Sequence, residues 1–232
     1  MLKNLAIVVL TLSMAACNNT TAIDSRRGLA PQPQTLVAQS ERVGANASSP
    51  VLIRIFKQSK ELELWRKTAD GSYALVKTYE ICTYSGELGP KIKQGDRQAP
   101  EGFYTVGASQ LNYHSIRYLS LNTGYPNIYD RMHGYTGAAL MIHGGCDSAG
   151  CFAIEDQPMQ EVFTAVRDAI KAGQKSVQVH IYPFRMNALN MFFNGENKNI
   201  GFWRQLKAGY DKFENTRSEL QVNIVNKKYV IN

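Results

Sequence analysis

Runs of apolar residues, some of them alternating with polar residues, predict a series of β-strands from residue 51 onward. The clearest alternation lies at residues 177–182, where every second residue is strongly apolar, as in a half-buried strand. Asp70-Gly71, between two apolar runs, favours a hairpin turn. Strands are therefore predicted at residues 51–56, 62–65, 73–76, 115–121, 138–143 and 177–182.

A longer spacing of apolar residues predicts helices. From Asp156 to Gly173, apolar residues recur on one helical face and glycine marks the end. A second amphipathic helix is predicted at residues 202–213, followed by a closing hairpin at residues 221–231. No repeat is visible in the sequence. The predicted fold class is therefore one mainly β domain with flanking helices.

The first residues have the layout of a secretory signal peptide, with Lys3, an apolar stretch at residues 5–12 and small residues up to Ala16. That stretch is too short to span a bilayer. Cys17 follows directly, an arrangement that resembles a bacterial lipobox, in which the Cys is lipidated and becomes the first mature residue. We therefore predict a lipoprotein signal peptide at residues 1–16 and a periplasmic protein anchored through Cys17. The alternative is a soluble periplasmic protein cleaved near Ala16.

Composition divides the rest of the chain. The segment after Cys17 is rich in Ala, Gln, Ser, Thr, Asn and Pro and almost free of aromatic residues, so residues 17–49 are predicted to be a flexible tether. Residues 50–185 are predicted to form the main domain. Residues 186–232 are predicted to be a helix and hairpin extension packed on the same domain.

The overall composition is that of a globular protein: 232 residues, 44% hydrophobic and 19% charged. Lys and Arg number 26 against 19 Asp and Glu, which gives a net charge of +7, but the bases are scattered. Because the sequence has no basic helix, zinc-finger spacing or aromatic-plus-basic motif, no nucleic-acid partner is expected. The positive excess suits an acidic polymer or a membrane surface nearby.

The number of cysteines points to a free thiol. Export would place them in an oxidising compartment, where an unpaired thiol needs a reason. Without Cys17, the three cysteines Cys82, Cys146 and Cys151 remain, so one is expected to be unpaired. Such a thiol is either a nucleophile or a buried, inert cysteine.

The segment around the last two cysteines has the residue types that a cysteine enzyme needs. These are a thiol nucleophile, an imidazole base, an acceptor that fixes the imidazole tautomer, and backbone N–H donors for the oxyanion. An apolar strand is predicted to end at His143-Gly144, and Cys151 follows after a short loop. We expect Cys151 to be the nucleophile, His143 its base and the Gly144 carbonyl the acceptor. Gly150 would let the backbone approach the substrate carbonyl closely.

Residues 143–153 read His-Gly-Gly-Cys-x-Ser-x-Gly-Cys-Phe-Ala. Upstream lie Ser-Gly-Glu-Leu-Gly-Pro-Lys at residues 85–91, Gly-Asp at 95–96 and Pro-Glu-Gly-Phe-Tyr at 100–104. Together these motifs resemble the YkuD-type L,D-transpeptidase domain, and more closely its YafK-like branch, over residues 51–181. The resemblance implies a YkuD-like β-sandwich domain. In that family the Cys attacks the carbonyl of the diamino-acid residue of a peptidoglycan stem peptide, releases D-alanine and passes the acyl group to an amine.

The resemblance assigns roles to individual residues. Cys151 matches the family nucleophile, and His143 matches the general base. Gly144 matches the residue whose backbone carbonyl steadies that histidine. Before the nucleophile, Ser148 and Gly150 match the Ser-or-Thr and the glycine of the family element.

The match departs from the family at Ala149, where most members have a second histidine, and in the seven-residue loop before the nucleophile, which is short. A mechanical count of the family spacing would select His133 as the base. A polar stretch leads into His133, however, so we interpret it as a loop histidine at the rim of the site. His114 and His180 are interpreted as surface or strand residues.

With Cys151 free, Cys82 and Cys146 are left to form a disulfide, which would pin the loop before the nucleophile to the strand carrying Cys82. Two alternatives stay open: a Cys146–Cys151 redox switch, and a metal cluster of these two cysteines with His133 and His143. Because the spacing matches no common zinc pattern, no metal and no cofactor is expected.

Stem peptides carry free carboxylates, which favour Lys or Arg nearby. Arg131 is the strongest candidate for such a contact. Lys91 and Lys93 also lie in segments that resemble the site-lining regions of the family. The alternative for each is a solvated surface residue.

The sequence therefore predicts a cysteine L,D-transpeptidase of cell-wall biogenesis and cell shape, which forms a thioacyl-enzyme with a stem tetrapeptide and passes the acyl group to an amine. One alternative is a hydrolase or amidase that resolves the thioester with water, for example to release a wall-attached protein. An alternative of another class is a non-catalytic peptidoglycan-binding lipoprotein. The expected partners are peptidoglycan stem peptides, a wall-attached protein, and a membrane reached through the lipid anchor.

Overall fold

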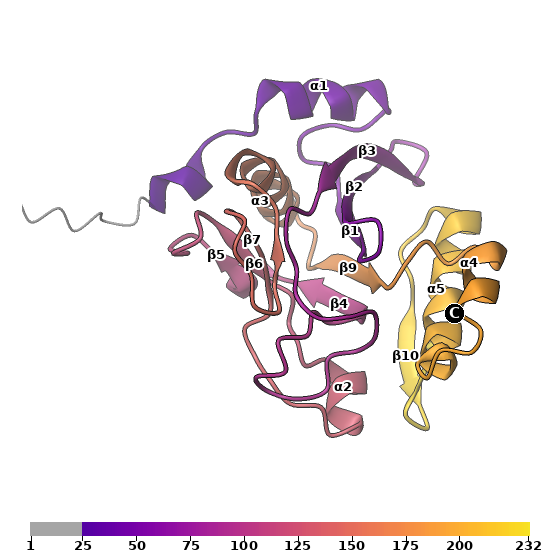
Figure 1. Cartoon of the computed structure of the whole chain (residues 1–232). Helices are drawn as coiled ribbons and strands as arrows, with labels where there is room; N and C mark the ends of the chain where they lie inside the picture. The colour runs from indigo at the N-terminus through magenta and orange to yellow at the C-terminus, as the bar shows by residue number, and fades with distance from the viewer. Residues whose placement is uncertain (1–24) are drawn as a thin grey trace, which may run out of the picture.

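The apolar run at residues 51–56 forms the middle of a five-stranded sheet (Figure 1). The structure is a computed structural model, and it describes residues 25–232. Strand β1 is buried throughout, because β2 pairs with it antiparallel, β9 pairs with it in parallel, and packed layers cover both of its faces. In the order β3-β2-β1-β9-β4, the sheet contains β1 (Val51–Phe56), β2 (Glu61–Lys67), β3 (Tyr73–Glu80), β4 (Gly102–Val106) and β9 (Val177–Tyr182).

A smaller, four-stranded sheet carries the predicted reactive residues. In the order β5-β6-β7-β8, it contains β5 (Leu111–Asn112), β6 (Ser120–Asn122), β7 (Met141–His143) and β8 (Phe152–Ala153). Only β7 and β8 are parallel to each other. The strands predicted at residues 115–121 and 138–143 are shorter than expected, because Tyr118 and Ala139 have positive φ angles of 70° and 55°, which interrupt the extended backbone.

Helix α3 (Asp156–Lys171) joins the two sheets into one core. Its apolar face buries Met159, Val162, Phe163 and Val166 in a cluster that also holds apolar residues of β1, β6 and β7. The short helices η2 (Ala108–Gln110) and α2 (Ile128–Met132) lie in the connections between strands. The predicted fold class, mainly β with flanking helices, is confirmed.

The C-terminal segment covers the opposite face of the five-stranded sheet (Figure 1). Because side chains alternate along a strand, β1 turns Leu52 and Phe56 toward this side. There they pack with Trp203, Leu206 and Phe213. The segment contains α4 (Ala188–Phe193), α5 (Ile200–Thr216), β10 (Val222–Val225) and β11 (Lys228–Ile231).

The prediction of a flexible tether is wrong for residues 25–49. This segment forms η1 (Ser25–Leu29) and α1 (Gln34–Arg42). Leu36 is fully buried in the main core, and the Arg167 side chain of α3 donates to the carbonyls of Gly28 (2.6 Å) and Ala30 (2.7 Å). The prediction from composition failed because this segment needs little apolar surface of its own. The buried Leu36 and the hydrogen-bonded carbonyls attach it to a core that other residues form.

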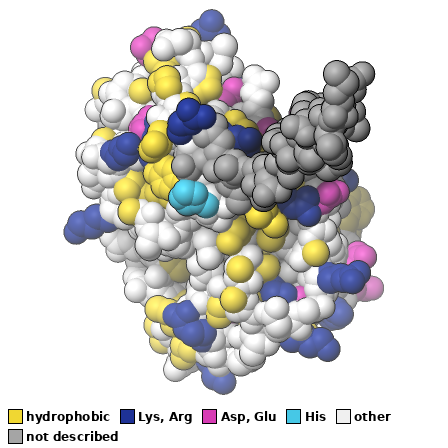
Figure 2. Space-filling model, turned by 90° about the vertical axis from the view of Figure 1, so that its left-hand side faces the viewer, with side chains coloured by type: hydrophobic (Ala, Val, Ile, Leu, Met, Phe, Trp, Pro, Cys, Tyr) yellow, Lys and Arg dark blue, Asp and Glu magenta, His cyan; other side chains and the backbone are white. Residues whose placement is uncertain are grey.

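The predicted signal peptide at residues 1–16, the lipidation site Cys17 and the start of the predicted tether lie outside the described residues. Within residues 25–232, no helix combines the length and apolar character needed to cross a membrane. Figure 2 shows basic side chains spread over one face of the molecule rather than gathered in a single patch, as the scattered bases of the sequence suggest.

Candidate active site

The parallel pairing of β7 with β8 brings Cys151, which directly precedes β8, beside the strand that carries His143. The register pairs His143 with Ala153, so Cys151 falls beside Met141. The Met141 N–H contacts the Cys151 Sγ at 3.4 Å, in keeping with this register. His143 therefore lies on β7 only two residues from Met141, whose backbone N–H contacts the Cys151 thiol.

The Cys151 thiol is free and partly buried. Its Sγ accepts from the Met141 N–H and lies 3.8 Å from the Ala139 carbonyl oxygen. Burial raises the pKa of the thiol, while the Met141 N–H and the charge of Lys91 lower it by less. The thiol is therefore neutral at neutral pH and needs a base in order to attack.

His143 is held in the form that such a base requires. Its side chain lies at the buried end of β7, and the residue is only 6% exposed. Nδ1 is 2.7 Å from the Gly144 carbonyl oxygen, so Nδ1 carries the proton and Nε2 is left as an acceptor. Burial lowers the pKa of His143, and the Gly144 carbonyl opposes that shift. The imidazole is thus neutral and able to take a proton.

Only glycine fits at position 144. A Cβ there would lie 2.7 Å from the Asp156 Oδ1, 2.8 Å from the Tyr118 Cβ and 2.9 Å from the Arg117 carbonyl oxygen. The Gly144 N–H also donates to the Leu119 carbonyl at 3.1 Å, which ties this residue to the neighbouring strand. The carbonyl that orients His143 is therefore fixed by close packing on both sides.

A disulfide joins Cys82 to Cys146, with 5.6 Å between the two Cα atoms. The pairing anchors the loop before the nucleophile to the chain after β3, where Thr83 also bridges to Ala153 of β8. Cys146 is therefore not available to Cys151 in this structure. Within residues 25–232, no group of three or more His, Cys, Asp and Glu side chains is arranged to hold a metal ion.

The turn that leads into Cys151 depends on Ser148 and Gly150. The Ser148 hydroxyl donates to the Cys151 carbonyl at 2.7 Å and so closes the loop onto the nucleophile. Gly150 has a φ of +107°, which favours glycine. A Cβ at Gly150 would meet no atom closer than 3.5 Å, so its backbone conformation, and not space, demands glycine. Ala149 between them is exposed.

The chain is 50% identical over 183 residues to a protein named "Putative L,D-transpeptidase YafK" from Escherichia coli strain K12, a match that spans 79% of this chain and 74% of the relative. The protein of the same name from Escherichia coli O157:H7 matches to the same extent. The chain belongs to the YafK-like L,D-transpeptidase family. No family model matches the chain.

Among solved structures, the YafK-like chain is similar to the helical cell shape determining protein Pgp2 from Campylobacter jejuni, with a TM-score of 0.46, 17% identity and coverage of 81% of this chain and 80% of that one. Bdellovibrio bacteriovorus Bd1075 is similar with a TM-score of 0.38, 19% identity and coverage of 80% and 78%. Both scores are below 0.5, so the family assignment rests on the sequence match.

Lys91 of the YafK-like chain is a buried cation whose charge lowers the pKa of the Cys151 thiol. It is buried, and its Nζ donates to the Lys93 carbonyl at 3.0 Å and pairs with the Asp96 carboxylate. Burial raises the pKa of Asp96, but hydrogen bonds from Lys91 and from three backbone N–H groups lower it to about 2. Lys91 is therefore committed to an internal ion pair, whereas Lys93 is exposed.

Arg131 lies apart from the reactive pair. It is exposed on α2, donates to the Pro126 carbonyl and lines a pocket to which neither Cys151 nor His143 contributes. His133 ends the same helix, with its Nδ1 2.8 Å from the Tyr129 carbonyl oxygen, as a loop histidine.

The other two histidines lie outside the reactive pair. His114 is exposed, and His180 is buried in β9, where its Nε2 contacts the Gln178 side chain.

Sequence reasoning missed a buried ion pair behind the site, between Lys57 and Glu101. The two side chains are 0% exposed, and the Lys57 Nζ is 3.0 Å from the Glu101 Oε1. Glu101 also accepts from the Gly89 N–H at 2.6 Å and from the Trp203 Nε1 at 2.8 Å. Burial lowers the pKa of Lys57, and Glu101 opposes that shift. The other three acceptors of the Lys57 ammonium are the carbonyls of Glu87 (2.8 Å), Gly89 (3.1 Å) and Ala99 (3.1 Å).

This ion pair holds both ends of residues 87–101, the loop that carries Lys91, against β1 and α5. A sequence signal for it existed. Lys57 directly follows the mostly apolar run of β1, which Arg54 alone interrupts, and a charged side chain buried there is expected to have a partner. The partner could not be named, because Glu101 lies far along the chain.

Proposed function

We propose that this YafK-like protein is a peptidoglycan-modifying cysteine L,D-transpeptidase, with Cys151 as nucleophile and His143 as general base. The observation that supports it most is the hydrogen bond between the His143 Nδ1 and the Gly144 carbonyl, which leaves Nε2 free to accept a proton on the strand beside Cys151. Membership of the L,D-transpeptidase family supports peptidoglycan as the substrate, and we take its stem peptide to be the part that reacts.

In the first half-reaction, the Cys151 Sγ attacks the carbonyl carbon of the diamino-acid residue of the stem, and its proton passes to the His143 Nε2. The bond to D-alanine then breaks, the leaving amine takes that proton, and a thioester remains. In the second half-reaction, an acceptor amine attacks the thioester, loses a proton to His143, and the thiol leaves with that proton. Ser148 and Gly150 shape the turn in which the oxyanion would form.

We further propose that the protein acts in the periplasm, anchored to a membrane through a lipid on Cys17. The support is the predicted signal peptide, with small residues just before Cys17. Because residues 25–49 are folded onto the domain, a tether could include only residues 18–24.

The test is to incubate the full chain, its Cys151→Ala variant and a His133→Gln control with muropeptides carrying tetrapeptide stems, and to identify the products by mass spectrometry. New cross-linked dimers or D-amino-acid exchange, lost with Cys151→Ala and kept with His133→Gln, are the expected result. Loss of D-alanine or of an attached peptide with uptake of water would replace the transferase by a hydrolase. Turnover that survives Cys151→Ala would overturn the proposal.

A further inference from the structure

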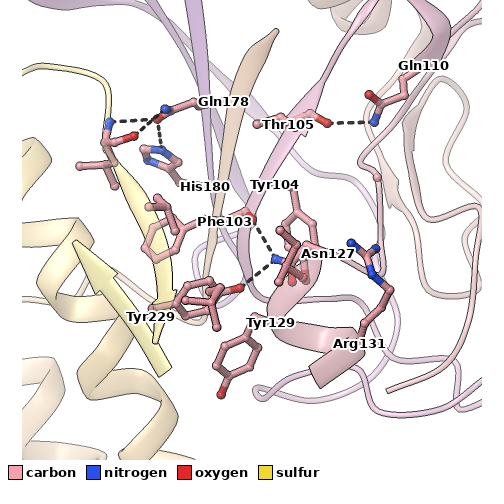
Figure 3. A pocket seen from close by; sticks show the side chains of 15 residues that line it. Phe103, Tyr104, Thr105, Gln110, Asn127, Tyr129, Arg131, Gln178, His180 and Tyr229 are labelled. Carbon is pink, nitrogen blue, oxygen red and sulfur yellow. Dashed lines mark hydrogen bonds between the residues drawn. The ribbon is translucent and has the colours of Figure 1, made fainter. Parts of the chain in front are cut away.

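A second cavity, of about 550 Å³, lies beside the free edge of β4, between α2 and the C-terminal hairpin (Figure 3). Neither Cys151 nor His143 lines it, so it is distinct from the reactive site. Its volume is in the range of small-molecule sites. It brings together segments that are far apart in the sequence, among them β4, α2 with its N-cap, β9 and residues 220–229.

One wall of this cavity is apolar. Leu220, Val222 and Ile224 alternate along the hairpin, so their side chains point to one side and line the cavity together. Phe103 and Tyr229 lie against each other with ring centroids 5.1 Å apart. Figure 3 shows these two rings between the hairpin and β4. The cavity thus offers apolar surface to the body of a ligand.

The side-chain amides in the cavity are already occupied. The Asn127 Nδ2 donates to the Phe103 carbonyl at 2.9 Å and to the Tyr229 hydroxyl at 2.8 Å. The Gln110 Nε2 donates to the Thr105 carbonyl at 2.8 Å.

The Gln178 amide is also occupied. It donates to the Leu220 carbonyl and accepts from the Leu220 N–H. Since the carbonyls on the free edge of β4 are capped by Asn127 and Gln110, a peptide cannot simply add a strand there.

Arg131 supplies the positive charge of this cavity. It is exposed, and its guanidinium donates to the Pro126 carbonyl, which leaves further N–H groups free. Within residues 25–232, Arg131 forms no ion pair. The neighbouring Asp130 carboxylate does not pair with it, because that carboxylate is buried and accepts from the Asn127 N–H and the Tyr104 hydroxyl. His180 also lines the cavity, but burial first and the charge of Arg54 second lower its pKa to about 3, so it adds no charge.

We propose that this cavity is a second ligand site, which binds a compact apolar ligand through one carboxylate on Arg131. A guanidinium binds a carboxylate through two parallel hydrogen bonds, and the apolar wall accommodates small side chains without a polar partner. Resting on the proposed function, we name the source as the alanine-terminated end of a wall peptide. The site would hold one stem peptide while Cys151 works on another.

The test titrates N-acetyl-D-alanyl-D-alanine into the full chain carrying Cys151→Ala, followed by calorimetry and by amide shifts in NMR spectra. We expect saturable binding with shifts at Thr105 and Ile224, and at least tenfold weaker binding with Arg131→Gln. Arg204→Gln, which removes an exposed cation outside the cavity, is the matched control and is expected to change nothing. Ile224→Asp places a repelling carboxylate on the apolar wall without touching Arg131, and is expected to weaken binding as well.

Two controls identify the chemistry. The C-terminal amide of the same dipeptide lacks the carboxylate, and equal binding of that amide would overturn the proposal, as would unchanged affinity with Arg131→Gln. Decanoate has the carboxylate without the peptide, and its binding in place of the dipeptide would overturn the wall peptide as the source. Binding is measured without turnover, so failure here is separate from failure of the proposed reaction, which the muropeptide products report.

Discussion

Two neighbouring regions of the molecule hold their key residues by opposite means. At the ends of β7 and β8, Cys151 and His143 are neutral and are positioned by backbone groups and by a nearby disulfide. Behind them, Lys57 and Glu101 form a fully buried ion pair in which every contact is a hydrogen bond to a fixed partner.

The difference follows from what each region does. A reacting pair must change charge during the reaction, so it is better held by neutral backbone groups that tolerate either state. The Lys57–Glu101 pair instead has to keep its charges, because it fixes the surrounding loops. Breaking a buried ion pair is costly, since the charge that remains would be buried without solvent or a partner. On the proposed mechanism, the molecule thus separates the groups that react from the charges that fix the surrounding loops.

The largest expected effect comes from His143→Gln, which keeps a side chain of similar size but removes the proton acceptor. We expect kcat/KM to fall about 10³-fold, within the usual range for a lost general base, and the urea midpoint to stay close to that of the unchanged protein. Muropeptide turnover and urea unfolding measure the two effects. A variant that keeps full turnover would show that another group takes the thiol proton.

The corresponding change in the supporting region is Lys57→Met, which leaves the Glu101 carboxylate buried without its partner. We expect the free energy of unfolding to fall by about 4 kcal/mol, measured by urea denaturation. Lys207→Met is the matched control, because Lys207 pairs with Asp211 at the surface. The control is expected to cost less than about 0.5 kcal/mol. Equal losses in the two variants would contradict the distinction between buried and exposed pairs.

Removal of the disulfide tests how the reactive region is held. Replacing both Cys82 and Cys146 by Ala frees a loop closed across 64 residues. We expect the free energy of unfolding to fall by about 3 kcal/mol, with turnover per folded molecule largely kept, since the Cys151 thiol remains. An unchanged urea midpoint would mean that the backbone contacts of Thr83 and Gly144 are enough to fix the loop.

The smallest effect concerns the charge state of the reactive pair. Burial raises the pKa of Cys151 above its ordinary value of 9.0 and lowers that of His143 below 6.5, so both groups are neutral between these values. Alkylation of Cys151 by iodoacetamide is therefore expected to accelerate as the pH rises through and beyond 9, with Cys151→Ala as the blank. A rate already at its plateau at pH 7 would instead reveal a thiolate–imidazolium pair.

The sequence by itself determined the parts that depend on local order. Cys151, His143 and Gly144 lie within nine residues, so the free thiol and the contact of His143 with the Gly144 carbonyl could be predicted before the strands were known to pair. The periodic segments β1, α3 and β9 were predicted correctly because burial on one or both faces leaves a regular pattern in the chain.

Only the tertiary structure decided the contacts between distant segments. Composition predicted a tether at residues 17–49, yet Leu36 and the carbonyls that Arg167 binds fix residues 25–49 to a core made by other residues. Lys57 and Glu101 are separated by 44 residues, and no local pattern pairs them. The pocket beside Arg131 likewise exists only because the C-terminal hairpin packs next to the edge of β4. Local periodicity records which face of a segment is buried, but it carries no information about which distant segment buries it.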